Sequence, residues 1–545
     1  MPPVALPFPL TALPGRRPGE GQGDLINVFA RKTGNLVRWQ RVPGTKRFTP
    51  GNGERQYFPT TPVLPQLYKL RGQLVIDNYL LSVWDDKVVR TTAAGIEQTL
   101  TGSMPGVDPV TMARNMRPAG AEIVAVSDGT AYLLDMAAGT TGAITGYPPS
   151  GGVPLGYVNS VDYFSGYFVF SQPNGVIIAS DLQTTAINPL SFDKAQAVAD
   201  GLLRVFSAQP MLLACGPQSI EVYQDVGSAP FPFQRVTVLP VGLMSPSAIA
   251  GGPSVWDRPV CFVASDGTVR QLRGLDPVII SNDDVVADIQ ECARSGLSDQ
   301  FRAQVYISGD NAIWSLTGAH DDEHRWTWEY NLSTGSWHRR RSYQPGQQHT
   351  NEPVFWRAMF AANFANSWIA QDAIDGGLIE ITAAEHKEPE IIRANPNPYP
   401  TTPPQPPYVF LQAPLIARCE SGPAKESPAN VRMPAIYLDF TVAFDVPGIP
   451  DPHVLLSWSH DGGATWSNAL ERRLGSRGEY RTLVTLRSTG RSSHQGMRLR
   501  WEVVDAVPIA FHSAVSPRSS ASRPRQVDIV HPTPSPPFLR GGANA

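Results

Sequence analysis

Two short acidic segments carry side chains of the types that bind metal ions. His320-Asp321-Asp322-Glu323-His324 brings two histidines and three carboxylates together in five residues. The segment lies between two expected strands, without a helix that would turn both histidines to one face, so a solvated turn is favoured over a metal site. Asn282-Asp283-Asp284 lacks the ligand spacing of a calcium loop and is typical of a helix start. We therefore predict no bound metal and no cofactor.

Residues 459–466 form a third pattern, S-x-D-x-G-x-T-W. It resembles the Asp-box hairpin of sialidase-type propellers, in which the aspartate accepts hydrogen bonds from turn N–H groups and the aromatic ring packs beneath. The resemblance implies a structural turn made by Ser459, Asp461, Gly463 and Trp466. The pattern occurs once, and the sequence has neither a glycine-rich phosphate loop nor a G-x-S-x-G elbow. We predict no catalytic residue, and keep a carbohydrate-binding or glycan-hydrolysing propeller as the alternative.

Basic residues cluster in three places, and tryptophans are interleaved with them. The clusters lie at 38–47, 339–341 and 472–500. A solvated strand face is one interpretation, and a subunit interface or a surface facing DNA phosphates is the other. Tryptophan and arginine are enriched in the cores of protein interfaces, which favours protein contact. The interface candidates are Arg38, Trp39, Arg339, Arg340, Arg341, Arg498, Arg500 and Trp501.

The composition indicates a β-rich protein with more than one domain. A chain of 545 residues is too long for a single core, and its 52 prolines disfavour long helices and central strands. The formal net charge of −3 gives no global reason for tight binding to nucleic acid or membrane. Cys215, Cys261, Cys292 and Cys419 have no metal spacing and predict buried free thiols. The N-terminus lacks the basic start of a signal peptide and no apolar run reaches about 18 residues, so we expect a soluble protein made in the cytoplasm without membrane insertion.

Short apolar strands joined by tight polar or glycine turns recur roughly every 40 to 50 residues, which is the spacing of propeller blades. Residues 260–272, VCFVASDGTVRQL, are typical of the unit. Residues 73–84 are expected as one strand, and Asp283–Arg294 as a helix ended by Ser295-Gly296. We predict a mainly β fold with a β-propeller, and a series of β-sandwiches is the competing architecture.

Five regions are expected along the chain. They are an N-terminal arm at 1–60, a propeller-like domain at 61–388, a Pro-rich linker at 389–408, a C-terminal β domain at 409–515 and an extended tail at 516–545. In the C-terminal domain, residues 455–503 predict an antiparallel sheet or sandwich with a hairpin closed by Asp461-Gly462-Gly463. On its last strand Leu499, Trp501 and Val503 are expected on one face, and Arg498, Arg500 and Glu502 on the other.

The order of these pieces resembles the tail nozzle, or packaged-DNA stabilisation (head-completion), proteins of short-tailed bacteriophages. The resemblance rests on the arm ending in Val42–Arg47, on the hairpin LLACGPQSIEVY at 212–223 with the Gly242-Leu243-Met244-Ser245 turn, and on the hairpin at 456–466 followed by basic strands at 487–503. The resemblance implies a structural virion protein without catalysis, and this protein is expected in the virion tail.

The resemblance also implies the partners. By this resemblance, six subunits would form a ring below the portal and adaptor proteins. The ring would retain the packaged genome and form its exit conduit. Tail fibres or spikes and a tail tip or needle would dock on their outer surfaces, and the genomic DNA would make non-specific contacts in the lumen. A mildly acidic chain suits a channel wall that should not grip passing phosphates, and the arginine-rich strand faces would then lie at subunit interfaces.

Overall fold

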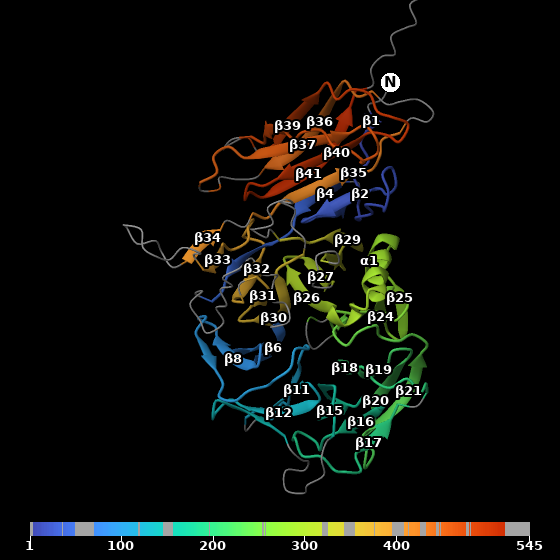
Figure 1. Ribbon diagram of the computed structural model, residues 1–545, viewed down its shortest axis with the longest axis vertical. Coiled ribbons are helices and arrows are strands. Elements are labelled where there is room, and N and C mark those ends of the chain that lie inside the picture. Colours follow the sequence, from blue (N-terminus) through green and yellow to red (C-terminus); the bar gives the residue numbers. More distant parts are fainter. Residues whose placement is uncertain are drawn as a thin grey trace, which may run out of the picture.

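The computed structural model describes residues 4–34, 36–49, 70–117, 120–144, 156–195, 197–252, 256, 258–318, 325–342, 355–374, 376–394, 408–411, 414–425, 432–442, 446, 448–475, 479 and 481–517. The segment His320–His324, most of the Pro-rich linker and the tail beyond Pro517 lie outside these residues. The described chain forms a disc of β-sheets with a second β domain stacked on its rim (Figure 1).

The disc is a β-propeller, and its described strands form seven four-stranded blades. Six blades are separate sheets, and the sixth blade in chain order is part of a nine-stranded sheet. The strands of the first four blades are β6 (Leu70–Ile76), β7 (Tyr79–Trp84), β8 (Lys87–Thr92) and β9 (Glu97–Thr99); β10 (Thr111–Arg114), β11 (Ile123–Ser127), β12 (Thr130–Asp135) and β13 (Thr140–Ala143); β14 (Ser160–Phe164), β15 (Tyr167–Ser171), β16 (Val176–Ala179) and β17 (Phe192–Lys194); and β18 (Arg204–Ala208), β19 (Met211–Cys215), β20 (Ile220–Asp225) and β21 (Phe233–Leu239).

The last three blades follow in the same way, with one exception. Their strands are β22 (Ile249–Ala250), β23 (Cys261–Val263), β24 (Val269–Arg273) and β25 (Asp276–Ile279); β26 (Arg302–Ser308), β27 (Asn311–Thr317), β28 (Thr327–Asn331) and β29 (Ser336–Arg339); and β30 (Ala358–Phe364), β31 (Ser367–Asp372), β32 (Leu378–Thr382) and β5 (Gly44–Arg47). The exception is β5, which comes from the N-terminal segment and pairs antiparallel with β32 from Gly44↔Thr382 to Arg47↔Ile379. The two ends of the propeller sequence are thereby joined in one blade.

The tight turns of the blades are formed by the aspartates and glycines that the sequence places there. In the second blade Asp128 and Gly129 have φ angles of 44° and 76° and connect β11 to β12. Aspartate tolerates this left-handed region and glycine adopts it without strain, which matches the twist of a hairpin. The expectation of one strand over residues 73–84 is wrong, because Asp77, at φ 47°, turns the chain between β6 and β7.

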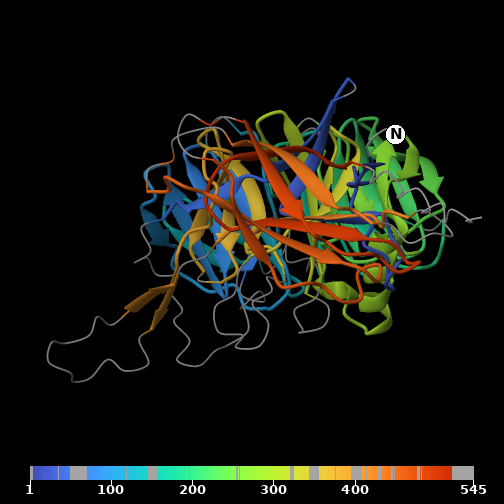
Figure 2. The same ribbon diagram turned by 90° about the horizontal axis from the view of Figure 1, so that it is seen from above.

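The second β domain is a sandwich of two antiparallel sheets. One sheet has the order β3 (Val28–Thr33), β4 (Leu36–Arg41), β41 (Ile509–Ser516), β36 (Ala435–Val442) and β39 (Arg481–Arg487), with β1 (Val4–Ala5) also paired to β41. The other contains β2 (Gly23–Ile26), β35 (Ala417–Ser421), β40 (Arg498–Val503), β37 (His453–Ser459) and β38 (Leu470–Arg473). Of the two arrangements expected over 455–503, a sheet or a sandwich, the sandwich is found, since β39 lies in the sheet opposite β37 and β40. A separate hairpin, β33 (Ile391–Ala394) and β34 (Tyr408–Leu411), projects from the body (Figure 2).

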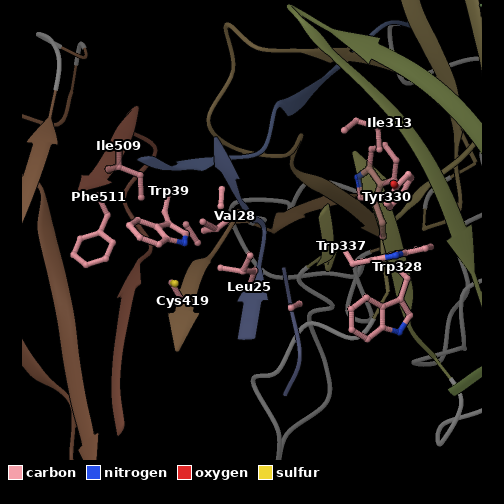
Figure 3. Packing of buried hydrophobic residues seen from close by; sticks show 14 of the residues in the cluster. Leu25, Val28, Trp39, Ile313, Trp328, Tyr330, Trp337, Cys419, Ile509 and Phe511 are labelled. Carbon is pink, nitrogen blue, oxygen red and sulfur yellow. The ribbon is translucent and has the colours of Figure 1, made fainter. Parts of the chain in front are cut away.

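The sandwich and the propeller share one sheet and one core. β2 pairs in parallel with β29 through Ile26↔Arg339 and antiparallel with β35, so nine strands run without a break from β26 to β38. One cluster of buried side chains extends from Trp314, Trp328 and Trp337 of the sixth blade to Trp501 and Phe511 of the sandwich. Figure 3 shows Leu25 and Val28 between Trp328 and Trp337 on one side and Phe511 on the other. The N-terminal segment thus belongs to both domains, because it supplies strands to each.

The helix α1 (Asp283–Arg294) has the bounds that its sequence predicts. Asn282 caps it, since its side chain accepts a hydrogen bond from the backbone N–H of Val285 at 3.0 Å. Val285, Ile289 and Cys292 recur on one face and are buried. A short 3-10 helix, η2 (Ser298–Gln300), follows it. Neither helix in the described ranges has the length and apolar character needed to cross a bilayer.

Candidate functional site

The Asp-box segment forms a hydrogen-bonded turn in the sandwich, between β37 and β38. The carboxylate of Asp461 accepts from the hydroxyl of Thr465 at 2.6 Å and from its backbone N–H at 2.9 Å. The hydroxyl of Ser459 donates to Asp461 at 2.7 Å and accepts from the N–H of Gly463 at 2.8 Å. The bonds from Thr465 hold the pKa of Asp461 far below its usual range. A carboxylate held ionised by its own turn is poorly suited to donate a proton to a glycosidic oxygen.

Trp466 supports a strand of the sandwich from outside the core. The guanidinium of Arg500 lies 3.9 Å from the centre of its ring, and the same guanidinium donates to Glu420 at 2.8 Å. Both Arg500 and Glu420 are largely covered, with side-chain exposures of 20% and 13%. Arg500 therefore links the turn after β37 to β35 through a cation–π contact and an ion pair.

Arg339 makes the principal charged contact between propeller and sandwich. Its guanidinium, at the end of β29, donates to Asp24 of β2 through Nε at 3.0 Å and through Nη2. Asp24 is buried, which alone would raise its pKa, but the charge and hydrogen bonds of Arg339 outweigh burial and lower the pKa. The guanidinium also lies over the ring of Trp328, 5.7 Å from its centre. The pair sits at the β-bridge that, within the described residues, joins the two domains.

The residues that follow Arg339 continue this junction. The side-chain amide of Asn27 donates to the carbonyl of Arg341, and its oxygen accepts from the N–H of Arg341, both at 2.9 Å. Arg340 is fully buried, donates to the carbonyl of Pro43 and lies over the ring of Trp356 at 4.6 Å. All three consecutive arginines therefore take part in contacts within the chain, and Arg339 and Arg341 are partly exposed.

Several other interface candidates are buried within the chain. Trp501 has no exposed surface and packs against Phe440 and Phe511, and Trp39 donates its ring N–H to the carbonyl of Pro9 at 2.7 Å. Arg498 is also buried and donates to the carbonyl of Glu20. A buried side chain offers no surface to a second subunit. The interface interpretation therefore needs correction for Trp39, Arg340, Arg498 and Trp501, and stays a prediction for Arg38, Arg339, Arg341 and Arg500.

A cavity of about 510 Å³ lies on the axis of the propeller, where the innermost strands of all seven blades meet. Asp162 and Arg204 line it together with Phe206. The carboxylate of Asp162 accepts from the N–H groups of Tyr163 at 2.7 Å and Ser207 at 2.8 Å, and burial raises its pKa. Burial also lowers the pKa of Arg204, whose guanidinium lies 5.2 Å from the centre of the Phe206 ring. No local pattern in the sequence predicts this cavity, because its residues come from blades far apart in the chain.

Two buried clusters of polar side chains, in the sixth and seventh blades, were also not predicted from the sequence. Glu329 accepts from the hydroxyl of Tyr306 at 2.9 Å and makes a 2.8 Å contact with His338, and Arg357 pairs with Asp372 in full burial. The signal in the sequence was a single charged residue inside an apolar strand, as in Trp328-Glu329-Tyr330. Among the described residues no three His, Cys, Asp or Glu side chains gather into a metal site. All four cysteines are buried.

Comparisons with known proteins agree with both domains. Two family models for bacteriophage P22 Gp10 match the chain, the β-propeller model over residues 57–253 and the β-sandwich model over residues 429–515. Together they cover slightly more than half of the chain. No curated protein matches.

Solved structures give a weaker likeness. The computationally designed Ika8 protein is 14% identical with a TM-score of 0.35, and the alignment covers 69% of this chain and 98% of that one. The WD40 β-propeller domain of Doa1 is 11% identical with a TM-score of 0.37, and the alignment covers 62% and 96% of the two chains. These scores are too low to add to the assignment.

Proposed function

Because the chain belongs to the family of bacteriophage P22 Gp10, a phage structural protein, we propose that it is a subunit of the tail nozzle ring of a short-tailed phage. The ring, a homo-hexamer in this proposal, closes the portal channel, retains the packaged DNA and forms the conduit through which the DNA leaves. Portal and adaptor proteins lie above it. Fibres or spikes and a tail tip or needle dock on its outer surfaces.

One observation carries this proposal. The family models match a propeller and a sandwich in the order in which the chain contains them, and they do so in separate halves of the sequence. The sandwich model covers β36 to β41, and the propeller model covers the first four blades. The assignment therefore does not depend on the propeller alone, a fold that hosts many unrelated functions.

The junction between the domains suits a subunit that must keep its shape under load. A shared sheet, a shared core and the Arg339–Asp24 pair fix the sandwich on the rim of the propeller. Cyclic rings use head-to-tail contacts, in which two different surfaces of each subunit meet. A rigid body holds such surfaces at a constant angle, and that angle determines how many subunits close the ring.

The carbohydrate-active alternative rested on the Asp-box. In the structure that turn lies in the sandwich, and the carboxylate of Asp461 is engaged by Ser459 and Thr465. These bonds give Asp461 a complete structural role within its own turn. Because the turn lies outside the propeller, it does not support a sialidase-like propeller.

Electron microscopy of the purified protein, and of particles that carry it, tests the proposal. We expect rings with a central channel, and particles with the same ring at the portal vertex. Particles that lack the protein should lose their packaged DNA. A species that stays monomeric and hydrolyses glycans would refute the proposal.

A further inference from the structure

Three arginines at the end of the sandwich have no counter-charge in the described chain. Arg487 ends β39, Arg491 follows four residues later, and Arg432 precedes β36. All three are exposed. No ion pair joins any of them to a carboxylate of the described residues, whereas Arg473 and Arg481 of the same domain pair with Asp451 and Asp439. We call Arg432, Arg487 and Arg491 the distal arginines.

Two of the distal arginines face each other directly. Arg432 and Arg491 are partners in an antiparallel β-bridge, which brings their Cα atoms within about 4.5–5.5 Å. Like charges in opposite positions destabilise a sheet. The folded chain therefore contains an unfavourable juxtaposition that an anion placed between the two guanidinium groups would remove.

The backbone around them is held in place. The N–H of Ser488 donates to the carbonyl of Pro434 at 3.2 Å, and the hydroxyl of Thr489 donates to the carbonyl of Met433 at 2.7 Å. The N–H of Ser493 donates to the carbonyl of His460 at 2.7 Å. The distal arginines thus project from an ordered scaffold, which lowers the entropic cost of binding.

The surface around these arginines differs from a typical protein interface. No large apolar side chain is exposed in the described residues of 423–434 or 487–497. Leu483 is the nearest along β39, four residues or about 13 Å from Arg487. Interface cores between proteins are anchored by apolar and aromatic side chains, whereas contacts with nucleic acid are more polar and much more positive. Small neighbours such as Ser488 and Gly490 leave room for a backbone phosphate, which the guanidinium fork binds in bidentate fashion.

We propose that the distal arginines form a contact surface for the phosphate backbone of nucleic acid. The contact reads no base sequence, because exposed arginines without groove-reading elements engage phosphates alone. The inference rests on the proposed function and deepens it by naming the surface of each subunit that meets the genome. Among the described residues the inference assigns three charges to each subunit, so each subunit holds the DNA weakly and the DNA can still slide.

The test compares two triple variants of the full chain. R432Q/R487Q/R491Q removes the distal arginines. R270Q/R473Q/R481Q removes the same number of charges from arginines that pair with Asp266, Asp451 and Asp439. Binding to a fluorescent duplex DNA is measured by anisotropy as the salt concentration is raised.

Three phosphate contacts add about 2.7 to the slope of log affinity against log salt, so a fourfold rise in salt weakens that part of binding by about 40-fold. We expect R432Q/R487Q/R491Q to lose this salt dependence and the control triple to keep it. Equal loss in both variants, or no binding of the unchanged protein at low salt, would overturn the inference.

A competition arm separates nucleic acid from an acidic protein partner. Unlabelled duplex DNA should displace the labelled duplex, and poly-glutamate of equal total charge should do so poorly. Equal displacement by poly-glutamate would assign the surface to an acidic polypeptide and refute the proposal. Electron microscopy of the same variants distinguishes the proposed function from the role of the distal arginines. If no sample forms rings, the proposed function is contradicted. The slope of log affinity against log salt tests the distal arginines separately.

Discussion

Replacing Asp24 by asparagine should loosen the junction between the domains. The change keeps the size of the side chain but removes the charge that faces Arg339, whose guanidinium is only 20% exposed. Removing one partner of a buried ion pair costs about 3–5 kcal/mol, because the other charge stays buried without compensation. We expect the lower end, about 3 kcal/mol, since Arg339 keeps its contact with Trp328 and the new amide oxygen still accepts one hydrogen bond.

Hydrogen exchange measures this effect where it occurs. The N–H of Asn27 donates to the carbonyl of Arg339 at 2.8 Å, and the N–H of Arg341 donates to Asn27. Their protection reports the local opening of the junction without unfolding of the whole chain. A loss of about 3 kcal/mol corresponds to about 150-fold faster exchange of both amides, since about 1.4 kcal/mol is a factor of ten. Amides in the first four blades should be unchanged.

The double variant D24N/R339M separates charge from packing. Removing both charges leaves no buried ion unpaired, so it should restore much of the protection lost in D24N. A loss of junction stability below about 1 kcal/mol in D24N, the range of surface salt bridges, would refute the reasoning.

The pH dependence of the junction's stability gives a second check. Because the folded pKa of Asp24 is lowered, its contribution is complete above the unfolded value of about 3.9 and is lost as pH falls through the folded pKa.

Three further outcomes follow from packing. Trp501→Ala should destabilise the sandwich by about 3–5 kcal/mol and lower its melting temperature, because the ring is fully buried between Phe440 and Phe511; unchanged melting would contradict this core. Gly129→Ala should also lower the melting temperature, because the residue has φ 76° and its new Cβ would lie 2.2 Å from the ring of Tyr157; Gly139→Ala, with φ 67° and open space around its Cβ, is the control for backbone strain alone. The four cysteines should resist alkylation at pH 8 until the chain is denatured, because burial raises the pKa of Cys215 to about 12 and also raises the pKa values of the other thiols for which a shift is resolved; rapid labelling of the folded protein would contradict their burial.

The sequence predicts the repeated hairpins because each is a local event. Residues 127–130 and 265–268 carry their own turn chemistry, so the strands on both sides were found without knowledge of the fold. The helix Asp283–Arg294 is equally local, since its cap and its apolar face lie within 13 residues. Periodicity also placed Leu499, Trp501 and Val503 on the buried face of their strand.

Features built from distant residues could not be predicted in this way. The pairing of β5 with β32 joins residues more than 300 positions apart, and no local signal encodes it. The same limit applies to the axial cavity and to the Arg339–Asp24 pair. Charge alone was misleading for Arg340 and Arg498, because an arginine can be buried when carbonyl oxygens and an aromatic face replace water, as Pro43, Trp356 and Glu20 do.

The nine-stranded sheet gives the subunit a defined path for mechanical force. A pull on the far strand β38 is transmitted from strand to strand through the hydrogen bonds of β37, β40, β35 and β2 to β29, the outer strand of the sixth blade. Among the described strands, the narrowest part of this path is the bridge between Ile26 and Arg339. Only tension large enough to overcome the shared core and the Arg339–Asp24 pair should open the sheet at this bridge, and the propeller and the sandwich would then separate while each stays folded.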